Sequence, residues 1–348
     1  MAKVKFDEIA RECRSTFKGD KTGVAIVGLE HIVPNEMLVK NYEVDTENTF
    51  SKSFKKGQIL FGRRRAYQQK AGVATFDGIC SGDITVIEAI QGKVDKDLLP
   101  FIIQNERFFE HAVQGSAGSL SPRVKWEHLA SYEFVLPSLS EQKILADKLW
   151  AAYRLKESYK KLLAATDEMV KSRFIEMFGV PANSTKGKRG EELFTFSSGK
   201  ANTKSNLDPS FQYNCYGGNG ITGKSKDYLL KDKTIVIGRV GEYCGCVHKT
   251  TDYCWITDNA IYLKTYSDLY RFEFIYHMFT MMDFHRFASE TGQPKITQAP
   301  LLSCHYPLPS LEEQNKFVAI AEQADKSKFE LRKSIEAIDQ VIKSLINN

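Results

Sequence analysis

Apolar residues recur at spacings of three and four positions over two long stretches of the chain, residues 138–178 and 310–348. Neither stretch contains proline or glycine, which interrupt helices. An average repeat of 3.5 positions predicts long helices that pack together as a coiled coil. Lys156 and Lys328 interrupt the apolar series. The expected seam comprises Leu145, Leu149, Leu163, Val170, Leu331, Ile335, Ile338, Ile342 and Leu345.

Both stretches begin with a pattern that favours a helix N-terminus. Ser138 lies three residues before Glu141, and Ser310 lies three residues before Glu313. In such a capping box, each side chain bonds the backbone N–H of the other residue. We therefore expect both helices to start beside these serines.

The two stretches belong to a longer internal repeat. Four pairs of segments correspond at offsets of 172 to 176 residues: 136–142 with 308–314, 121–124 with 293–296, 61–63 with 237–239, and 81–83 with 257–259. The first pair is the clearest, because Leu-Pro-Ser-Leu-Ser-Glu-Gln returns as Leu-Pro-Ser-Leu-Glu-Glu-Gln. A repeat in constant order indicates two copies of one module.

The predicted fold is α+β with a pseudo-two-fold internal repeat. Residues 1–137 and 179–309 form mixed, β-rich globular domains, and residues 138–178 and 310–348 form a pair of long antiparallel coiled-coil helices between them. Short apolar runs separated by glycine-rich turns predict the strands of the two domains: 24–27, 58–61, 84–87, 234–237 and 260–263. Aromatic-rich segments predict one helix in each domain, over 98–113 and 269–288.

Composition narrows the class of protein. The chain is 42% hydrophobic and 26% charged, as expected for folded domains. Its apolar runs are too short to cross a bilayer, and its start lacks the apolar region of a signal peptide. Seven cysteines without framework spacing are typical of a reducing compartment, so we expect a cytoplasmic protein. The net charge of +5 permits a nucleic-acid partner.

Three segments resemble chemical sites. Cys244, Cys246, His248 and Cys254 could supply metal ligands, although no Cys-x-x-Cys pair is present and small core cysteines are the simpler interpretation. Residues 218–225 satisfy the P-loop pattern, but a turn and a strand are expected after them instead of a helix. Asp208-Pro-Ser-Phe resembles the base-gripping tetrapeptide of amino-methyltransferases without its second proline. A stand-alone adenine DNA methyltransferase is therefore the alternative hypothesis.

Basic and amide side chains in glycine-rich loops favour DNA binding. Cations neutralise phosphates, and arginine and glutamine have the fork geometry that reads guanine and adenine edges. The densest group is the run of residues 63–70. The expected DNA-binding residues are Lys55, Lys56, Arg63, Arg64, Arg65, Tyr67, Gln68, Gln69, Lys70, Lys224, Lys226 and Arg239.

Two β-rich domains, each followed by Leu-Pro-Ser-Leu-x-Glu-Gln and a long helix, resemble the specificity subunit of type I restriction–modification systems. Residues 216–223 and 291–296 also resemble segments of that family's target recognition domains, whereas the corresponding segment 118–124 lacks the glutamine. This resemblance adds four expected DNA-binding residues: Arg123, Asn219, Gln293 and Lys295.

The resemblance implies a non-catalytic DNA reader. Residues 1–137 and 179–309 would be target recognition domains, each recognising one half of a bipartite, asymmetric double-stranded target. The helices would set the spacing of the half-sites and dock two methyltransferase subunits, which methylate adenine with S-adenosylmethionine. Two motor–nuclease subunits would use ATP and Mg²⁺. This chain itself would bind no cofactor and no membrane.

Overall fold

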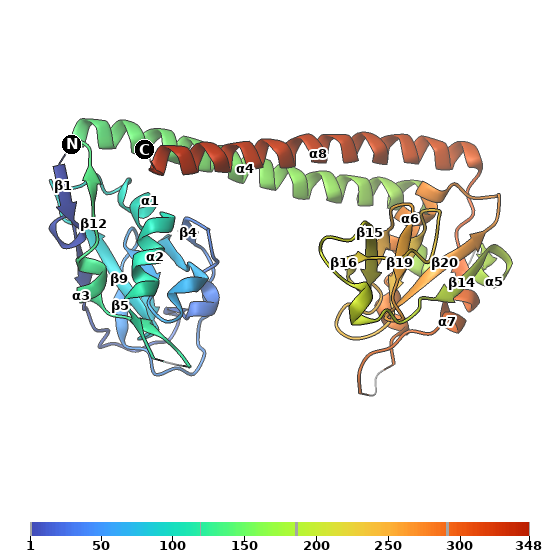
Figure 1. Cartoon of the computed structure of the whole chain (residues 1–348), viewed down its shortest axis with the longest axis horizontal. Coiled ribbons are helices and arrows are strands. Elements are labelled where there is room, and N and C mark those ends of the chain that lie inside the picture. Colours follow the sequence, from blue (N-terminus) through green and yellow to red (C-terminus); the bar gives the residue numbers. More distant parts are fainter. Residues whose placement is uncertain (1, 119, 185–186, 290–291, 348) are drawn as a thin grey trace. The chain divides into compact units, whose positions relative to one another are not determined.

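The computed structural model describes residues 2–118, 120–184, 187–289 and 292–347. Met1 and Asn348, at the limits of the predicted domains, and Ser119 and Thr291, in the segments 118–124 and 291–296, lie outside the described residues. The chain forms two compact units, one of Met1–Lys160 with Arg332–Asn348 and one of Lys161–Leu331. Each unit contains one β-rich domain and part of both long helices (Figure 1). In the described part of the chain, no helix is long and apolar enough to cross a membrane.

The first unit is built on two sheets. The larger has the strand order β2-β9-β6-β7-β4, and these strands cover Ala10–Cys13, Ile84–Ala89, Ile59–Gly62, Ala71–Ala74 and Leu38–Val39. The smaller has the order β3-β8-β5, covering Ala25–Val27, Gly78–Cys80 and Lys52–Phe54. A third pairing joins β1 (Ala2–Lys5) to β12 (Glu133–Leu136). Two short strands, β10 (Ser116–Ala117) and β11 (Arg123–Val124), also pair with each other.

The helices of this domain are shorter than the sequence pattern predicts. The prediction of a single helix over 98–113 is wrong. The segment forms two helices, α1 (Leu99–Ile103) and α2 (Glu106–Gln114). Asn105 has extended backbone angles and its side chain accepts the N–H of Arg107, which starts a new helix at this point. A third helix, α3 (Trp126–Ala130), precedes β12.

The second unit repeats this arrangement. Its larger sheet has the order β14-β20-β17-β18, covering Phe194–Ser198, Ala260–Tyr266, Ile235–Gly238 and Val247–Lys249. Its smaller sheet has the order β16-β15-β19, covering Gly220–Ser225, Tyr213–Gly217 and Cys254–Ile256. The remaining elements are β13 (Lys188–Arg189) paired with β21 (His305–Tyr306), and the helices α5 (Gly190–Leu193), α6 (Phe272–Thr280) and α7 (Gln298–Ser303).

The helix expected over 269–288 is also wrong in its length. Helix α6 ends at Thr280, and a short 3-10 turn, Phe284–Phe287, follows it. Asp283, between the two, has a φ of 43°, a left-handed conformation that no α-helix contains. All five predicted strands are confirmed; four agree within two residues at each end, and the fifth, predicted over 260–263, extends three residues further, to Tyr266.

The two long helices are confirmed. Helix α4 covers Leu139–Phe178 and α8 covers Leu311–Asn347. Both predicted capping boxes form, because Ser138 N–H donates to Glu141 at 2.9 Å and Ser310 N–H donates to Glu313 at 2.9 Å. Among the predicted seam residues, Leu149 and Val170 are buried and the other seven are half-buried.

Within each unit the helix segments run antiparallel. In the first unit, Lys156 of α4 bonds Asp339 of α8 at 2.6 Å; in the second, Lys328 of α8 bonds Asp167 of α4 at 2.8 Å. The two ion pairs are related by the 172-residue repeat, with the helices exchanged. The lysines that interrupt the apolar series are thus paired across the helices. The predicted α+β fold, two β-rich domains and two long antiparallel helices, is confirmed.

Candidate nucleic-acid interface

In the first unit, three segments meet where strand β6 ends. The N–H of Arg63 donates to the carbonyl of Asp83 at 2.9 Å, and the N–H of Val124 donates to the carbonyl of Arg63 at 3.0 Å. The N–H of Arg65 donates to the carbonyl of Pro122 at 2.8 Å. These three backbone bonds hold the loop after β6 against the loop after β8 and against residues 121–124.

The second unit contains the same three bonds. The N–H of Arg239 donates to the carbonyl of Asn259 at 2.9 Å, and the N–H of Ile296 donates to the carbonyl of Arg239 at 2.9 Å. The N–H of Gly241 donates to the carbonyl of Pro294 at 2.9 Å. The residues involved are related by the offsets of the sequence repeat, so the repeated segments build one backbone frame in both domains. We call each set of three bonds a loop frame.

Each loop frame lies at the end of its domain that is remote from that unit's helix segments. The segment between α2 and α3, which contains residues 121–124, extends away from α4 in Figure 1. The segment between α6 and α7 does the same in the second unit. The loop frames are therefore open to a partner on a side that the helices do not cover.

Two arginines in the first loop frame share one carboxylate. Arg123 Nε donates to Asp83 Oδ1 at 2.6 Å, and Arg64 Nη1 donates to Asp83 Oδ2 at 3.3 Å. Arg64 also donates from Nε and Nη2 to Ser121 Oγ, at 3.1 and 2.8 Å. Burial raises the pKa of Asp83, but its hydrogen bonds and charge interactions with Arg123 and Arg64 outweigh this effect and hold the pKa below its usual value.

Other predicted residues of the run 63–70 are divided between this frame and other contacts. Arg65 is exposed with a φ of 54°, and Tyr67 beside it is 57% exposed. Lys70 Nζ donates to the carbonyl of Leu29 at 2.7 Å, so its charge is held by the domain. Gln68 is half-buried on the short turn that follows Arg65. Arg63 Nε is buried without a hydrogen-bond partner among the described residues.

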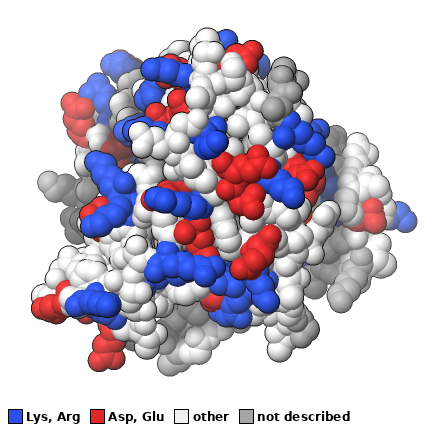
Figure 2. Space-filling view, turned by 90° about the vertical axis from the view of Figure 1, so that its left-hand side faces the viewer, with Lys and Arg blue, Asp and Glu red and all other residues white. Residues whose placement is uncertain are grey.

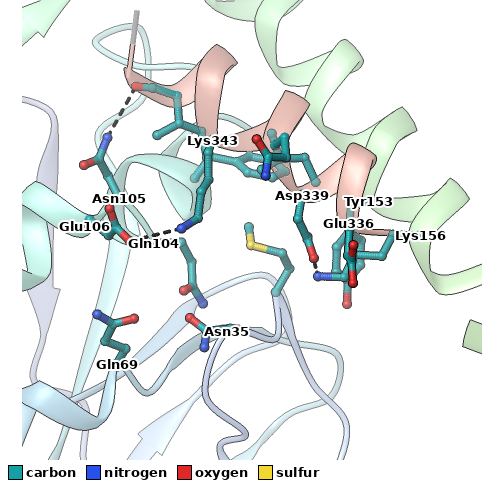
Figure 3. A pocket seen from close by; sticks show the side chains of 15 residues that line it. Asn35, Gln69, Gln104, Asn105, Glu106, Tyr153, Lys156, Glu336, Asp339 and Lys343 are labelled. Atoms are coloured by element: carbon teal, nitrogen blue, oxygen red, sulfur yellow. Dashed lines mark hydrogen bonds and ion pairs between the residues drawn. The ribbon is translucent and has the colours of Figure 1, made fainter. Parts of the chain in front are cut away.

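Gln69 lies apart from the loop frame. It lines a cavity of about 520 Å³ within the first unit, which α8 closes on one side (Figure 3). Around that cavity Lys343 pairs with Glu106 at 3.2 Å, and Asn105 donates to the carbonyl of Ile346 at 3.3 Å. These contacts hold the last turns of α8 to the first domain.

Lys55 and Lys56 are also separated from the arginines. They precede β6, whereas residues 63–65 follow it, so they lie at the opposite end of a fully buried strand. Lys55 pairs with Asp77 at 2.9 Å, and the N–H of Lys56 donates to the same carboxylate at 2.8 Å. The structure does not bring these two lysines to the loop frame.

The predicted residues of the second domain divide in the same way. Arg239 belongs to the loop frame, and Gln293 and Lys295 are exposed beside Pro294. The β15–β16 turn, with exposed Asn219, lies next to them, because a methyl group added at Gly218 would be 3.3 Å from the carbonyl of Asn259. Lys224 and Lys226 are at the other end of this hairpin, where Lys224 Nζ donates to Asn214 at 2.7 Å.

The segments that resemble catalytic motifs have structural roles. Residues 218–225 form the turn and second strand of a hairpin, and the next regular element after them is strand β17, as expected, and not a helix. Asp208 accepts hydrogen bonds from the N–H and hydroxyl of Ser210, which closes an exposed turn. Cys244 and Cys254 are buried, and no group of His, Cys, Asp or Glu among the described residues could hold a metal ion.

Sequence reasoning missed Asp83 and Ser121. Both lie in segments that the repeat pairs, 81–83 with 257–259 and 121–124 with 293–296, so the repeat carried the signal that could have found them. Their chemistry, one carboxylate and one hydroxyl, gave no reason to add them to a group of cations. The outer face of the first unit in Figure 2 carries Lys and Arg interspersed with Asp and Glu, so charge alone does not mark an interface there.

The sequence profile of the family described as "Type I restriction modification DNA specificity domain" matches the chain twice, at residues 8–165 and 186–340. Two specificity subunits of Escherichia coli type I restriction enzymes are similar in sequence. EcoprrI is 29% identical over 141 residues, which cover 40% of this chain and 34% of the relative. EcoDI is 27% identical over 120 residues, which cover 32% and 26%. The matches thus span about a third or less of these relatives.

Two solved structures share the fold. The S subunit of the type I restriction-modification system from M. genitalium has a TM-score of 0.62 at 14% identity, over 99% of this chain and 94% of that one. A second structure comes from work on the complex assembly and conformational transition of the type I R-M system. It has a TM-score of 0.58 at 17% identity, over 99% of this chain and 96% of that one. At such identities the likeness is one of fold.

Proposed function

Because the chain belongs to the family of type I restriction–modification DNA specificity domains, we propose that it is the DNA-reading subunit of such a system. Each β-rich domain reads one half of a bipartite, asymmetric target in double-stranded DNA. The chain performs no catalysis and binds no cofactor in this role. It acts in the cytoplasm, where the DNA of a bacterial cell lies.

The observation that carries this proposal is the loop frame. Its backbone hydrogen bonds are the same in both domains, whereas its side chains differ. Corresponding positions hold Arg64 and Val240, Asp83 and Asn259, Ser121 and Gln293, and Arg123 and Lys295. Base edges are read by side chains, whereas backbone bonds only place them. Two frames with different side chains support two different half-sites, and hence a target without two-fold symmetry.

The long helices provide the second part of the proposed role. In the second unit, Leu162 and Met169 of α4 lie seven residues apart, so they share one face of the helix, and both are exposed. An exposed apolar row supports docking of partner proteins along the helix. We propose that the helices hold two methyltransferase subunits, which bind S-adenosylmethionine and methylate adenine, and fix the spacing of the half-sites. Two motor–nuclease subunits, which use ATP and Mg²⁺, complete the restriction enzyme.

The first test is methylation in a cell. The chain is expressed with its cognate methyltransferase subunit in a host without adenine methylation, and modified adenines are mapped by single-molecule sequencing, with each protein alone as a control. A split, asymmetric motif that needs both proteins is the expected result. Methylation by this chain alone would instead support the stand-alone methyltransferase, and a symmetric motif would contradict two different half-sites.

The second test places the interface. Reversing the charge of Arg63, Arg64 and Arg65 should weaken DNA binding by the assembled complex and reduce the slope of affinity against salt by about one for each phosphate that is no longer neutralised. Reversing Lys55 and Lys56, at the other end of β6, is the matched control and should change neither. Equal effects of the two variants would move the interface away from the loop frame.

A further inference from the structure

Asp83 holds both arginines of the first loop frame by their guanidinium groups. Besides the contact from Nε, Arg123 donates from Nη2 to Asp83 Oδ2 at 3.4 Å, which makes the pair bidentate. The carboxylate side chain is only 17% exposed, whereas the side chains of Arg64 and Arg123 are 38% and 46% exposed. The acid therefore lies on the protein side of the cluster and the arginines on the solvent side.

Enough donors remain for a ligand. A guanidinium has five N–H groups. Arg123 uses two of them on Asp83, and Arg64 uses one on Asp83 and two on Ser121. Each arginine keeps N–H groups that these contacts leave unused, and their direction is fixed because both side chains are held at the guanidinium.

This arrangement suits a base better than a phosphate. Asp83 cancels one of the two positive charges, which weakens attraction to the DNA backbone. A phosphate accepts hydrogen bonds from many directions, and the exposed cation of Arg65 in the same loop would serve it without a carboxylate. Guanine is the base that presents two acceptors, O6 and N7, side by side in the major groove, and an oriented arginine matches them.

The second domain carries different side chains at the positions that correspond to this cluster. Asn259 replaces the carboxylate, Val240 replaces Arg64, and Lys295 replaces Arg123. A lysine lacks the planar fork that makes bidentate contacts specific. The two loop frames therefore differ in the base chemistry that they can recognise.

We infer that Asp83 makes Arg64 and Arg123 the guanine-reading side chains of the first domain, so that the half-site read by this domain contains a guanine recognised in the major groove. Asp83 is a positioning residue, and the arginines touch the base. This inference rests on the proposed function and adds to it the base class and the residues that select it.

The experiment compares variants of the complex of this chain with its methyltransferase subunit, using binding to a library of randomised half-sites. Asp83→Asn keeps the shape of the side chain and removes the charge that orients the arginines. Arg123→Lys keeps the positive charge and removes the fork. Asp77→Asn, which breaks the Lys55 contact at the other end of β6, is the matched control.

We expect Asp83→Asn and Arg123→Lys each to reduce discrimination for guanine at one position of the first half-site by about tenfold or more. Total affinity for non-specific DNA should stay equal or rise in Asp83→Asn, because a negative charge is removed, and the second half-site should stay the same. A role of Asp83 in loop stability alone would instead weaken recognition at every position of the first half-site and lower non-specific binding as well. Asp77→Asn should behave as the unmodified complex.

Three results would overturn the inference. The first is an unchanged guanine preference in a folded Arg123→Lys complex. Because this variant does not alter Asp83, it keeps the test valid even if Asp83→Asn fails to fold. The second is a first half-site without guanine. The third is an unmodified complex with no sequence preference, which would refute the DNA-reading function as well and is recognised by the methylation map. A gain of guanine preference at the second half-site on introducing Val240→Arg, Asn259→Asp, Gln293→Ser and Lys295→Arg would support it from the opposite direction.

Discussion

Replacing Gln314 by leucine should destabilise the second unit by much more than its small change in volume suggests. Gln314 is the last residue of the repeated Leu-Pro-Ser-Leu-x-Glu-Gln segment and is fully buried. Its side-chain oxygen accepts the N–H of Arg271 at 2.8 Å, and its nitrogen donates to the carbonyls of Leu269 and Pro309 at 2.9 and 3.0 Å. One amide thus joins the start of α8 to the start of α6.

The magnitude follows from the groups left without partners. Leucine removes the partner of three partly buried backbone groups, the N–H of Arg271 and the carbonyls of Leu269 and Pro309, and each costs about 1 kcal/mol, the lower end of the range for a buried group. We expect a decrease in stability of about 3 kcal/mol, which lowers the midpoint of thermal unfolding of this unit by about 6–12 °C. Gln142, its counterpart in the first unit, makes two such bonds, to Asp95 and Pro137, so Gln142→Leu should cost about 2 kcal/mol.

The assay is thermal unfolding of the full chain followed by near-ultraviolet circular dichroism, with hydrogen exchange to assign the destabilisation to a unit. Gln323→Leu, an exposed glutamine on the same helix, is the control and should change stability by less than about 0.5 kcal/mol. Exchange should increase at the start of α6 in Gln314→Leu. A midpoint within about 2 °C of the unmodified protein would refute the anchoring role.

Three further predictions concern the helices and their contacts. A double-mutant cycle on Lys328→Met and Asp167→Ala should give a coupling of about 0.5–1 kcal/mol that declines in about 1 M salt, and zero coupling would contradict a cross-helix ion pair. Burial lowers the pKa of His277 to about 4 from its ordinary 6.5, so this side chain is neutral in the folded state and the unfolded chain takes up the proton first. Stability should therefore fall as the pH drops from about 6.5 to about 4, and His277→Gln should flatten this dependence in unfolding measured across that range. Inserting seven residues after Thr166 and seven after Lys328 keeps the helix phase, and should lengthen the gap in the methylated motif without changing either half-site; altered half-sites would refute the spacer role.

Local signals in the sequence were enough for the elements whose stability is local. The capping boxes at Ser138 and Ser310 set the starts of both helices, because the bonds that form them join residues three apart. The short apolar runs became strands because a run of apolar residues and the turns that flank it act over a few residues. The repeat predicted two similar domains, since similar segments in the same order build the same module.

Contacts between residues far apart in the sequence shape the parts of the structure that local patterns did not predict. The aromatic segments 98–113 and 269–288 look like single helices, yet Asn105 starts a new one and Asp283 adopts a left-handed conformation. Asn and Asp favour helix caps and left-handed turns but also occur inside helices, so the residue type alone does not locate either interruption. Gln69 belongs to the same polar run as Arg64, but the turn after β6 places it at the cavity beside α8. Lys55 flanks the same strand as Arg64, but it lies at the start of β6 and pairs there with Asp77.

The division between backbone and side chain explains why the candidate site was only partly visible in the sequence. The loop frame is held by N–H and carbonyl groups, which every residue except proline carries in full, so its side chains can change while the frame is kept. The sequence repeat is therefore strong at the glycine and proline positions of the turns and weak at Asp83, Ser121 and their counterparts. Reading two different half-sites, the function we propose for this chain, requires this combination: one frame that folds twice, and side chains on it that are free to differ.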